Sequence, residues 1–232
     1  MRKLLSVTLC LLILCTSVCA FSETRARWSH TYQFGDRSVP KVSITIDDWF
    51  SAGEWLPRFM ELADKYDVKL TLYPCGFNLH VEDRQYWQAA LDAGHVIGSH
   101  FFTHQRLTQR TQTQIINDIA KFGKALDETL GYHYEFLTVR PPYGAGVTGT
   151  KRPVSGAVHA AGYDHIILWD MDNTRDLAYA LKTIQNGSII LLHANKRDLA
   201  FMEKLLEGLK DRNYQYVTVH ELLNITDRCI YE

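Results

Sequence analysis

The amino-acid sequence predicts an α/β fold in which about seven parallel strands alternate with helices. Short runs rich in Val, Ile, Leu and aromatic residues recur from residue 41 onward, as is typical of strands buried on both faces. Longer amphipathic segments separate these runs, as in repeated βα units. A barrel is the favoured closure of the sheet, and an open doubly wound sheet is the alternative.

The expected strands share a short apolar centre bounded by polar or turn residues. They are Val42–Ile46, Val68–Tyr73, His95–Gly98, Phe136–Val139, His165–Trp169, Ser188–Leu192 and Tyr216–Val219. The expected helices are amphipathic, with their apolar residues on one face. They are Glu54–Tyr66, Arg84–Ala93, Thr113–Leu130, Thr174–Ile184 and Asp198–Leu209. Gly94 and Gly131 directly follow two of them, where glycine commonly ends a helix.

Length and composition are those of one globular domain. The chain has 232 residues, of which 46% are hydrophobic and 22% are charged, which is enough for one complete core. Residues 21–40 are polar and end at Pro40. We therefore expect an irregular lead-in over 21–40, followed by a single domain over 41–232.

Residues 1–20 have the parts of a secretory signal peptide. Arg2 and Lys3 give a positive start, an apolar stretch covers residues 4–18, and small residues lie at the expected cleavage point. The apolar stretch is shorter than the roughly 20 residues that a membrane-spanning helix needs. We expect a secreted or periplasmic protein without stable membrane insertion after cleavage, and an uncleaved anchor is the alternative.

The remaining charge and cysteines narrow the class of partner. Cleavage would remove two basic residues and no acidic one, which changes the formal charge from −1 to −3. No basic stripe is present, which argues against a nucleic-acid partner. Cys75 and Cys229 would be left. In an oxidising compartment they can form one disulfide or stay separate thiols, and the sequence leaves both open.

Unusual polar residues follow the expected strands. In chain order they are Asp47 and Asp48, His100 and His104, Arg140, Asp170 and Asp172, and His193. The carboxyl ends of parallel strands lie at one edge of a sheet or barrel, where functional groups gather. Each motif alone is weak and has an ordinary structural explanation. Their shared placement predicts one site.

The paired histidines and aspartates suit a metal. His100 and His104 are four residues apart, so on a helical turn their imidazoles would face the same way. Two histidines, one carboxylate and water make a common catalytic zinc site. Zinc suits hydrolysis because it lowers the pKa of bound water to about 7 and polarises a carbonyl. Of Asp47 and Asp48, one can bind the metal while the other serves as a base.

Two further segments carry groups that suit hydrolysis. Arg140 begins Arg-Pro-Pro-Tyr-Gly, in which two prolines stiffen the turn. Such a loop could direct a backbone N–H to an oxyanion, and Arg140 could orient a carboxylate. A well-made turn with a surface arginine is the alternative. His193 ends an apolar run, and it can be a general acid or a core histidine with a satisfied hydrogen bond.

Five short segments form an ordered set. They are Thr45-Ile46-Asp47-Asp48, Ser99-His100-Phe101-Phe102-Thr103-His104, Arg140-Pro141-Pro142-Tyr143-Gly144, Trp169-Asp170-Met171-Asp172 and Ile190-Leu191-Leu192-His193. The set resembles the five motifs of the polysaccharide deacetylases, the NodB-homology domain of carbohydrate esterase family 4. The resemblance runs from about residue 41 to 222 and is highly specific, because five ordered motifs fall on the expected strand ends.

The resemblance implies a distorted (β/α) barrel with fewer than eight regular strands, and a polysaccharide deacetylase catalytic domain over residues 41–232. It implies that Asp48, His100 and His104 bind the metal, which would be zinc, cobalt or another divalent ion. Asp47 would be the general base, and His193 would protonate the leaving amine.

Supporting roles come from the same resemblance. Arg140 would orient the base Asp47. Asp172 would tune the acid, and the backbone N–H of Tyr143 would stabilise the oxyanion. The side chains expected to contact the substrate are Trp49, Pro142, Tyr143 and Leu191.

Two positions depart from the family pattern. The family usually has Gly after the paired aspartates, where this chain has Trp49. We expect the indole to narrow the groove or to stack on a sugar face. The family usually has Trp in the fourth motif, where this chain has Asp176 followed by Leu177. The catalytic groups are therefore complete, while one wall of the groove differs.

The predicted function is removal of N-acetyl groups from a GlcNAc-containing polysaccharide or oligosaccharide, such as peptidoglycan, chitin or an exopolysaccharide. One alternative is O-deacetylation of a polysaccharide such as acetylxylan. Another alternative keeps the fold, with a site that hydrolyses a small amide or cyclic imide instead of a polysaccharide. A different class is a carbohydrate-binding relative without turnover, against which the complete set of base, acid and metal ligands argues.

Overall fold

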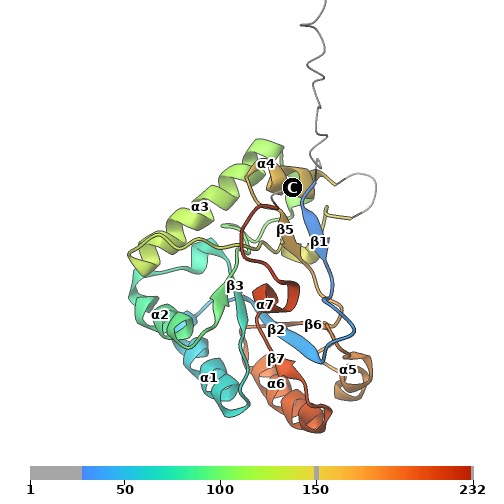
Figure 1. Ribbon diagram of the computed structural model, residues 1–232. Helices are drawn as coiled ribbons and strands as arrows, with labels where there is room; N and C mark the ends of the chain where they lie inside the picture. The colour runs from blue at the N-terminus through green and yellow to red at the C-terminus, as the bar shows by residue number, and fades with distance from the viewer. Residues whose placement is uncertain (1–27, 149–151, 231–232) are drawn as a thin grey trace, which may run out of the picture.

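The strands of the computed structural model, which describes residues 28–148 and 152–230, form a parallel sheet and a smaller parallel pair (Figure 1). The strands are β1 (His30–Tyr32), β2 (Lys41–Asp48), β3 (Thr71–Pro74), β4 (Val96–Ile97), β5 (His165–Ile167), β6 (Ile189–His193) and β7 (Gln215–Tyr216). The larger sheet has the order β4-β3-β2-β6, with β7 also pairing with β2, and β1 pairs with β5. Every pairing between these strands is parallel.

Isolated bridges join the two sheets into a distorted barrel. Ser99, just past β4, bridges Val139, and Val139 in turn bridges Ile166 of β5. On the other side Met171 bridges Ile190 of β6. The ring of strands therefore closes, and the predicted α/β barrel is confirmed. The predicted strand over 136–139 is wrong as a regular strand, since Val139 alone pairs with its neighbours there, through isolated bridges.

The expected irregular lead-in contributes a strand. β1 lies within residues 21–40, and His30, Thr31 and Tyr32 pair in register with the three residues of β5. Three residues are too short to show an alternation in sequence, so this strand depends on its partner. The segment after residue 28 therefore adds a strand beside β5 instead of only leading into the domain.

The helices are α1 (Ala52–Lys65), α2 (Arg84–Asp92), α3 (Gln112–Leu130), α4 (Pro153–Ala160), α5 (Leu177–Thr183), α6 (Lys196–Leu209) and α7 (Val219–Leu223). Helices α1, α2, α3, α5 and α6 lie around the outside of the strands, whereas α7 lies near the middle of the view (Figure 1). The longest, α3, begins with a capping box between Thr111 and Gln114 and ends at Gly131, whose φ of 84° favours glycine. α5 begins later than expected, because the Asp176 side chain caps its first turn. α4 and α7 were not predicted.

Strand β2 is the centre of the core. Its neighbours are β3, β6 and β7, and Val42, Ile44 and Ile46 are fully buried. Ser43 and Thr45, which alternate with these apolar residues, are also fully buried, so both faces of the strand are covered. The charged end of β2 is thereby held in a rigid place.

The structure tests the cysteine pairing and part of the expectation about the membrane. The predicted signal peptide, residues 1–20, lies outside the described residues. Within residues 28–148 and 152–230, no helix combines the length and apolar character needed to cross a membrane. Cys75 and Cys229 are free thiols. Cys75 is buried beside Asp48, and burial raises the pKa of its thiol.

Candidate metal centre and active site

The carboxyl ends of the central strands bring the predicted residues together. Asp47 and Asp48 end β2, and His193 ends β6. Parallel register places Asp47 opposite His193, and Asp48 opposite Pro74 at the end of β3. The site therefore lies at the edge where functional groups of a barrel gather.

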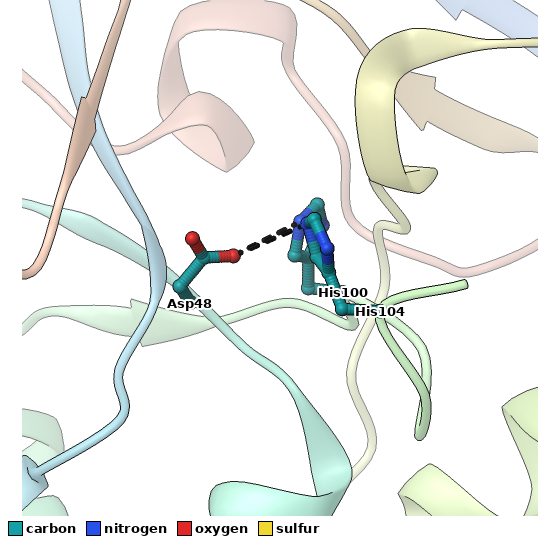
Figure 2. Close-up of side chains that lie close together, drawn as sticks. All are labelled: Asp48, His100 and His104. Carbon is teal, nitrogen blue, oxygen red and sulfur yellow. Dashed lines mark ion pairs between the residues drawn. The ribbon is translucent and has the colours of Figure 1, made fainter. Parts of the chain in front are cut away.

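Asp48, His100 and His104 point toward one another in a geometry that fits one divalent cation (Figure 2). The Asp48 Oδ1 atom lies 3.6 Å from His100 Nε2 and 3.4 Å from His104 Nε2. One ligand atom from each residue lies within 4.8 Å of the others. A tetrahedral zinc ion with bonds of about 2.0–2.2 Å holds its ligand atoms about 3.4 Å apart. The two separations from the Asp48 oxygen thus match those of a tetrahedral zinc site.

The His100 ring is prepared as a ligand. Its Nδ1 lies 2.7 Å from the carbonyl oxygen of Arg140. Because a carbonyl only accepts, Nδ1 carries the proton and Nε2 presents its lone pair to the site. Burial lowers the pKa of His100, against the opposing effect of the two nearby aspartates. The neutral imidazole that a metal requires is therefore favoured.

His104 reaches the site through a loop. The expected helical turn is wrong, since residues 100–106 contain no helix and Phe101 has a φ of 65°. Asp118 of α3 fixes this loop by accepting hydrogen bonds from the backbone N–H groups of Phe102 and Thr103, at 2.6 and 3.0 Å. It also accepts the Thr103 hydroxyl at 2.7 Å. Sequence reasoning missed Asp118, because a single aspartate within a helix carries no signal of its distant partner.

Asp48 is held in an unusual backbone conformation. Its φ is 77°, a left-handed value uncommon for residues other than glycine. Its carbonyl oxygen accepts hydrogen bonds from the Cys75 backbone N–H at 3.3 Å and the Asn78 side chain at 3.0 Å. The segment after β3 therefore stabilises the turn that presents the Asp48 carboxylate.

Trp49 does not line the groove. Its side chain is fully buried, and its indole N–H donates to the Ile46 carbonyl at 2.8 Å. The ring packs edge-on against Phe59 and Trp87, with centroids 5.7 Å apart in both cases. The expected contact of Trp49 with a sugar is therefore wrong. The positive φ of residue 49, 56°, directs the indole into the core and explains why glycine suits this position.

Asp47 is a buried carboxylate with a buried partner. Its Oδ1 lies 2.7 Å from Arg140 Nη1, and Arg140 is fully buried. Arg140 is fixed by Thr45 Oγ1 at 2.7 Å and by the carbonyl oxygens of Ile167 and Leu168 at 3.1 Å. Since every guanidinium nitrogen of Arg140 donates a hydrogen bond, the buried charge of Arg140 is compensated and its position is fixed. The other Asp47 oxygen, Oδ2, lies 3.7 Å from His100 Nε2, beside the position that a cation would take.

The carboxylate that contacts His193 is Asp198 of α6. Asp198 Oδ2 lies 3.4 Å from the ring Nδ1 and accepts the His193 backbone N–H at 2.9 Å. The hydrogen bond to Asp198 raises the pKa of His193, against the opposing effect of burial. Burial would raise the pKa of the Asp198 carboxyl, but hydrogen bonds from His193 and Arg197 outweigh it and lower that pKa.

The predicted pairing of Asp172 with His193 is therefore corrected. Asp172 is exposed, and with Asn173, Thr174, Arg175, Tyr179 and Arg197 it lines a polar cavity of about 500 Å³. Its neighbour Asp170 has a structural role, accepting hydrogen bonds from Arg37 at 2.7 Å and Ser188 at 3.0 Å. Helix α6 begins three residues after His193, so Asp198 in its first turn reaches the histidine ring.

The remaining predicted substrate residues differ in exposure. Pro142 and Leu191 are buried, whereas Tyr143 is 55% exposed. The Tyr143 ring lies edge-on against His104, with centroids 4.8 Å apart. Its backbone φ is 63°, so the peptide at this position has an uncommon orientation. Tyr143 therefore combines an exposed ring with a fixed backbone next to a predicted metal ligand.

Sequence comparison decides the family. The profile of the family described as polysaccharide deacetylase matches residues 35–166, more than half of the chain. This chain belongs to the polysaccharide deacetylase family.

Similar deacetylases come from several bacteria. The chain is 29% identical over 192 residues to the peptidoglycan-N-acetylglucosamine deacetylase PgdA of Listeria monocytogenes, covering 78% of this chain and 38% of that protein. It is also 29% identical over 197 residues to a peptidoglycan-N-acetylglucosamine deacetylase of Bacillus cereus, covering 78% and 87% of the two chains. The chain thus spans about two fifths of the length of the Listeria protein.

A solved structure confirms the fold of this polysaccharide deacetylase family member. The structure is that of BA3943, described as a carbohydrate esterase family 4 pseudoenzyme from Bacillus anthracis. It aligns with a TM-score of 0.71 at 22% identity, covering 84% of this chain and 69% of that one. Because the same fold also occurs in a pseudoenzyme, the activity of this chain depends on its own site residues.

Proposed function

We propose that this protein is a zinc-dependent hydrolase that removes N-acetyl groups from a GlcNAc-containing polysaccharide of the bacterial cell envelope. The observation that carries the proposal is Asp47, a buried carboxylate whose Oδ1 lies 2.7 Å from Arg140. It lies beside Asp48, His100 and His104, which we call the metal set. A carboxylate in that position, separate from the ligands, is what a hydrolase needs and a binding module does not.

Each residue of the metal set has one role. Asp48, His100 and His104 would hold the cation, and a set of two imidazoles and one carboxylate suits zinc. When bound, the ion polarises the acetyl carbonyl and makes water a stronger acid. Arg140 donates a hydrogen bond to Oδ1 of Asp47, and Oδ2 faces the metal ligands. Oδ2 would therefore accept a proton from the attacking water.

His193 supplies the proton that the leaving group needs. As water oxygen bonds to the acetyl carbon, the C–N bond breaks, and the amine nitrogen takes a proton from His193. Asp198 holds the Nδ1 side of the ring, which leaves Nε2 to face the substrate. The hydrogen bond to Asp198 raises the pKa of His193, which favours the protonated ring that a general acid requires. The products are acetate and a free amine.

Tyr143 would stabilise the negative charge that develops on the carbonyl oxygen. Its backbone N–H would donate to that oxygen, and the left-handed φ of 63° fixes the direction of the peptide. Packing of its ring against His104 couples this donor to the metal set. Preorganised donors of this kind need no rearrangement during the reaction.

The place of action is part of the same proposal. The residue pattern over 1–20 predicts export, and the relatives in Listeria and Bacillus are named for deacetylation of peptidoglycan. We therefore propose peptidoglycan, in the periplasm or outside the cell, as the first polymer to test. The predicted catalytic domain over residues 41–232 would carry the whole site.

The test is acetate release from a panel of chitin oligomers, peptidoglycan, poly-GlcNAc and acetylxylan, using purified protein loaded with zinc. We expect release from at least one N-acetylated polymer, loss with a chelator and recovery with zinc or cobalt. Release from acetylxylan alone would indicate an O-deacetylase. Polymer binding without acetate release from any substrate would refute the hydrolase and indicate a non-catalytic relative.

A further inference from the structure

Two exposed phenylalanines lie side by side near the metal set. The side chain of Phe50 is 63% exposed and that of Phe77 is 40% exposed. Their ring centroids are 6.1 Å apart, with planes inclined by 56°. Phenylalanine is normally buried, so a contiguous exposed pair suggests a contact surface.

Backbone hydrogen bonds fasten Phe77 to the segment that carries the histidine ligands. The N–H of Phe77 donates to the carbonyl of Phe102 at 3.0 Å, and the N–H of Gly76 donates to that of Phe101 at 2.8 Å. A Cβ at Gly76 would lie only 2.6 Å from the Phe102 ring, so the two segments are in close contact. Phe77 therefore has a fixed position relative to His100 and His104.

Phe50 is fixed by the turn at the end of β2. It lies two residues after Asp48, and Trp49 between them occupies the buried side of the turn. The positive φ values of Asp48 and Trp49 make this turn tight. With the indole in the core, the next side chain is presented to solvent, next to Phe77.

We propose that Phe50 and Phe77 form a sugar-binding subsite, which stacks on a pyranose ring of the polymer next to the sugar whose acetyl group reacts. This inference rests on the proposed function. The C–H groups of a pyranose form an apolar face that suits an aromatic ring, and loops at the carboxyl end of barrel strands commonly bind substrate.

The size of the surface favours a sugar over a protein partner. A stable protein interface buries about 800 Å² on each side. A phenylalanine offers about 150–250 Å² even when it is completely covered. Two rings therefore supply only a fraction of a protein interface, whereas they suffice for one or two sugar units.

The test compares substrates of different length. In Phe50→Ala and Phe77→Ala, we expect KM for hexasaccharide substrates to rise about tenfold per ring, with kcat nearly unchanged. For the shortest substrate that wild type deacetylates, KM should stay within about twofold, because that substrate does not reach the subsite. Phe77→Trp should retain wild-type KM. Tyr132→Ala is the matched control, since Tyr132 is 43% exposed and lies after α3, away from the site.

The outcomes separate this inference from the proposed function. Equal KM in wild type and both alanine variants at every length, or equal losses with short and long substrates, would overturn the subsite while leaving the hydrolase intact. If wild type releases no acetate, calorimetric binding of the hexasaccharide decides instead. Weaker binding by the alanine variants then supports the subsite, and unchanged binding refutes it.

Discussion

Asp198→Asn tests the corrected partner of His193. The substitution removes a buried charge but keeps the size of the side chain, and the amide oxygen can still accept the His193 backbone N–H. Two unit charges 3.4 Å apart attract by about 5 kcal/mol at an effective dielectric constant of about 20. The His193 side chain is 41% exposed, so solvent reduces this to about 1–2 kcal/mol. We therefore expect about a tenfold loss of kcat/KM above neutral pH.

The direction of the pH effect follows from the sign of the shift. Asp198 raises the pKa of His193, so the wild-type acid stays protonated to higher pH. In Asp198→Asn, the alkaline limb of the kcat/KM profile should therefore move to lower pH. The stability that the pair contributes is complete below the ordinary histidine pKa of about 6.5, and it is lost as pH rises through the raised value. Thermal melts between pH 6 and 9 should accordingly slope less in the variant than in wild type.

Two matched variants control this experiment. Arg197→Gln removes the 2.7 Å contact between Arg197 and Asp198 but keeps the carboxylate beside His193, so its profile should resemble that of wild type. Asp172→Asn changes the residue first predicted for this role, and it should leave the alkaline limb in place. An unmoved limb in Asp198→Asn, together with a shifted limb in Asp172→Asn, would refute our reading of the site.

Three other substitutions test separate parts of the site. Asp47→Asn should abolish acetate release while zinc content, measured by plasma emission spectrometry, stays near one ion per chain; an emptied site would mean that Asp47 is itself a ligand. Asp118→Ala removes three hydrogen bonds from the loop that carries His104, so zinc affinity measured by competition with a chelator should fall about 10- to 100-fold, and unchanged affinity would contradict that support. Trp49→Ala should lower the free energy of unfolding by about 3–5 kcal/mol in urea titrations, while KM of the folded enzyme stays near that of wild type. A raised KM with normal stability would instead indicate that Trp49 contacts the substrate.

The sequence predicted the regular parts of the fold because they depend on local pattern. β2 and α3 have long apolar or amphipathic runs, and the structure places them close to the expected bounds. β1 could not be predicted, since its three residues become a strand only by pairing with β5, more than 130 residues later. The bridges of Val139 also depend on distant partners and replace a regular strand.

The same distinction applies to the site. Asp48, His100 and His104 were predicted because residue type, order and strand-end position all marked them, and the structure brings them together. The partner of His193 could not be predicted from the ordered motifs. Asp198 lies in the first turn of α6, capped by Asn195, and only the angle between β6 and that helix brings its carboxylate to the ring.

Backbone strain explains how the chain can depart from the family at position 49. Among described residues, Asp48, Trp49, Phe101 and Tyr143 have positive φ and belong to segments that carry site residues. Asp67, Asn213 and Asn224 also have positive φ and lie in other turns. A left-handed conformation costs about 1–2 kcal/mol for an ordinary residue. Complete burial of an indole of about 150–250 Å² contributes about 4–6 kcal/mol. Burial therefore outweighs the strain, so tryptophan can replace glycine here without loss of the turn that presents Asp48. The next residue, Phe50, is 63% exposed, so the turn that buries Trp49 presents Phe50 to solvent.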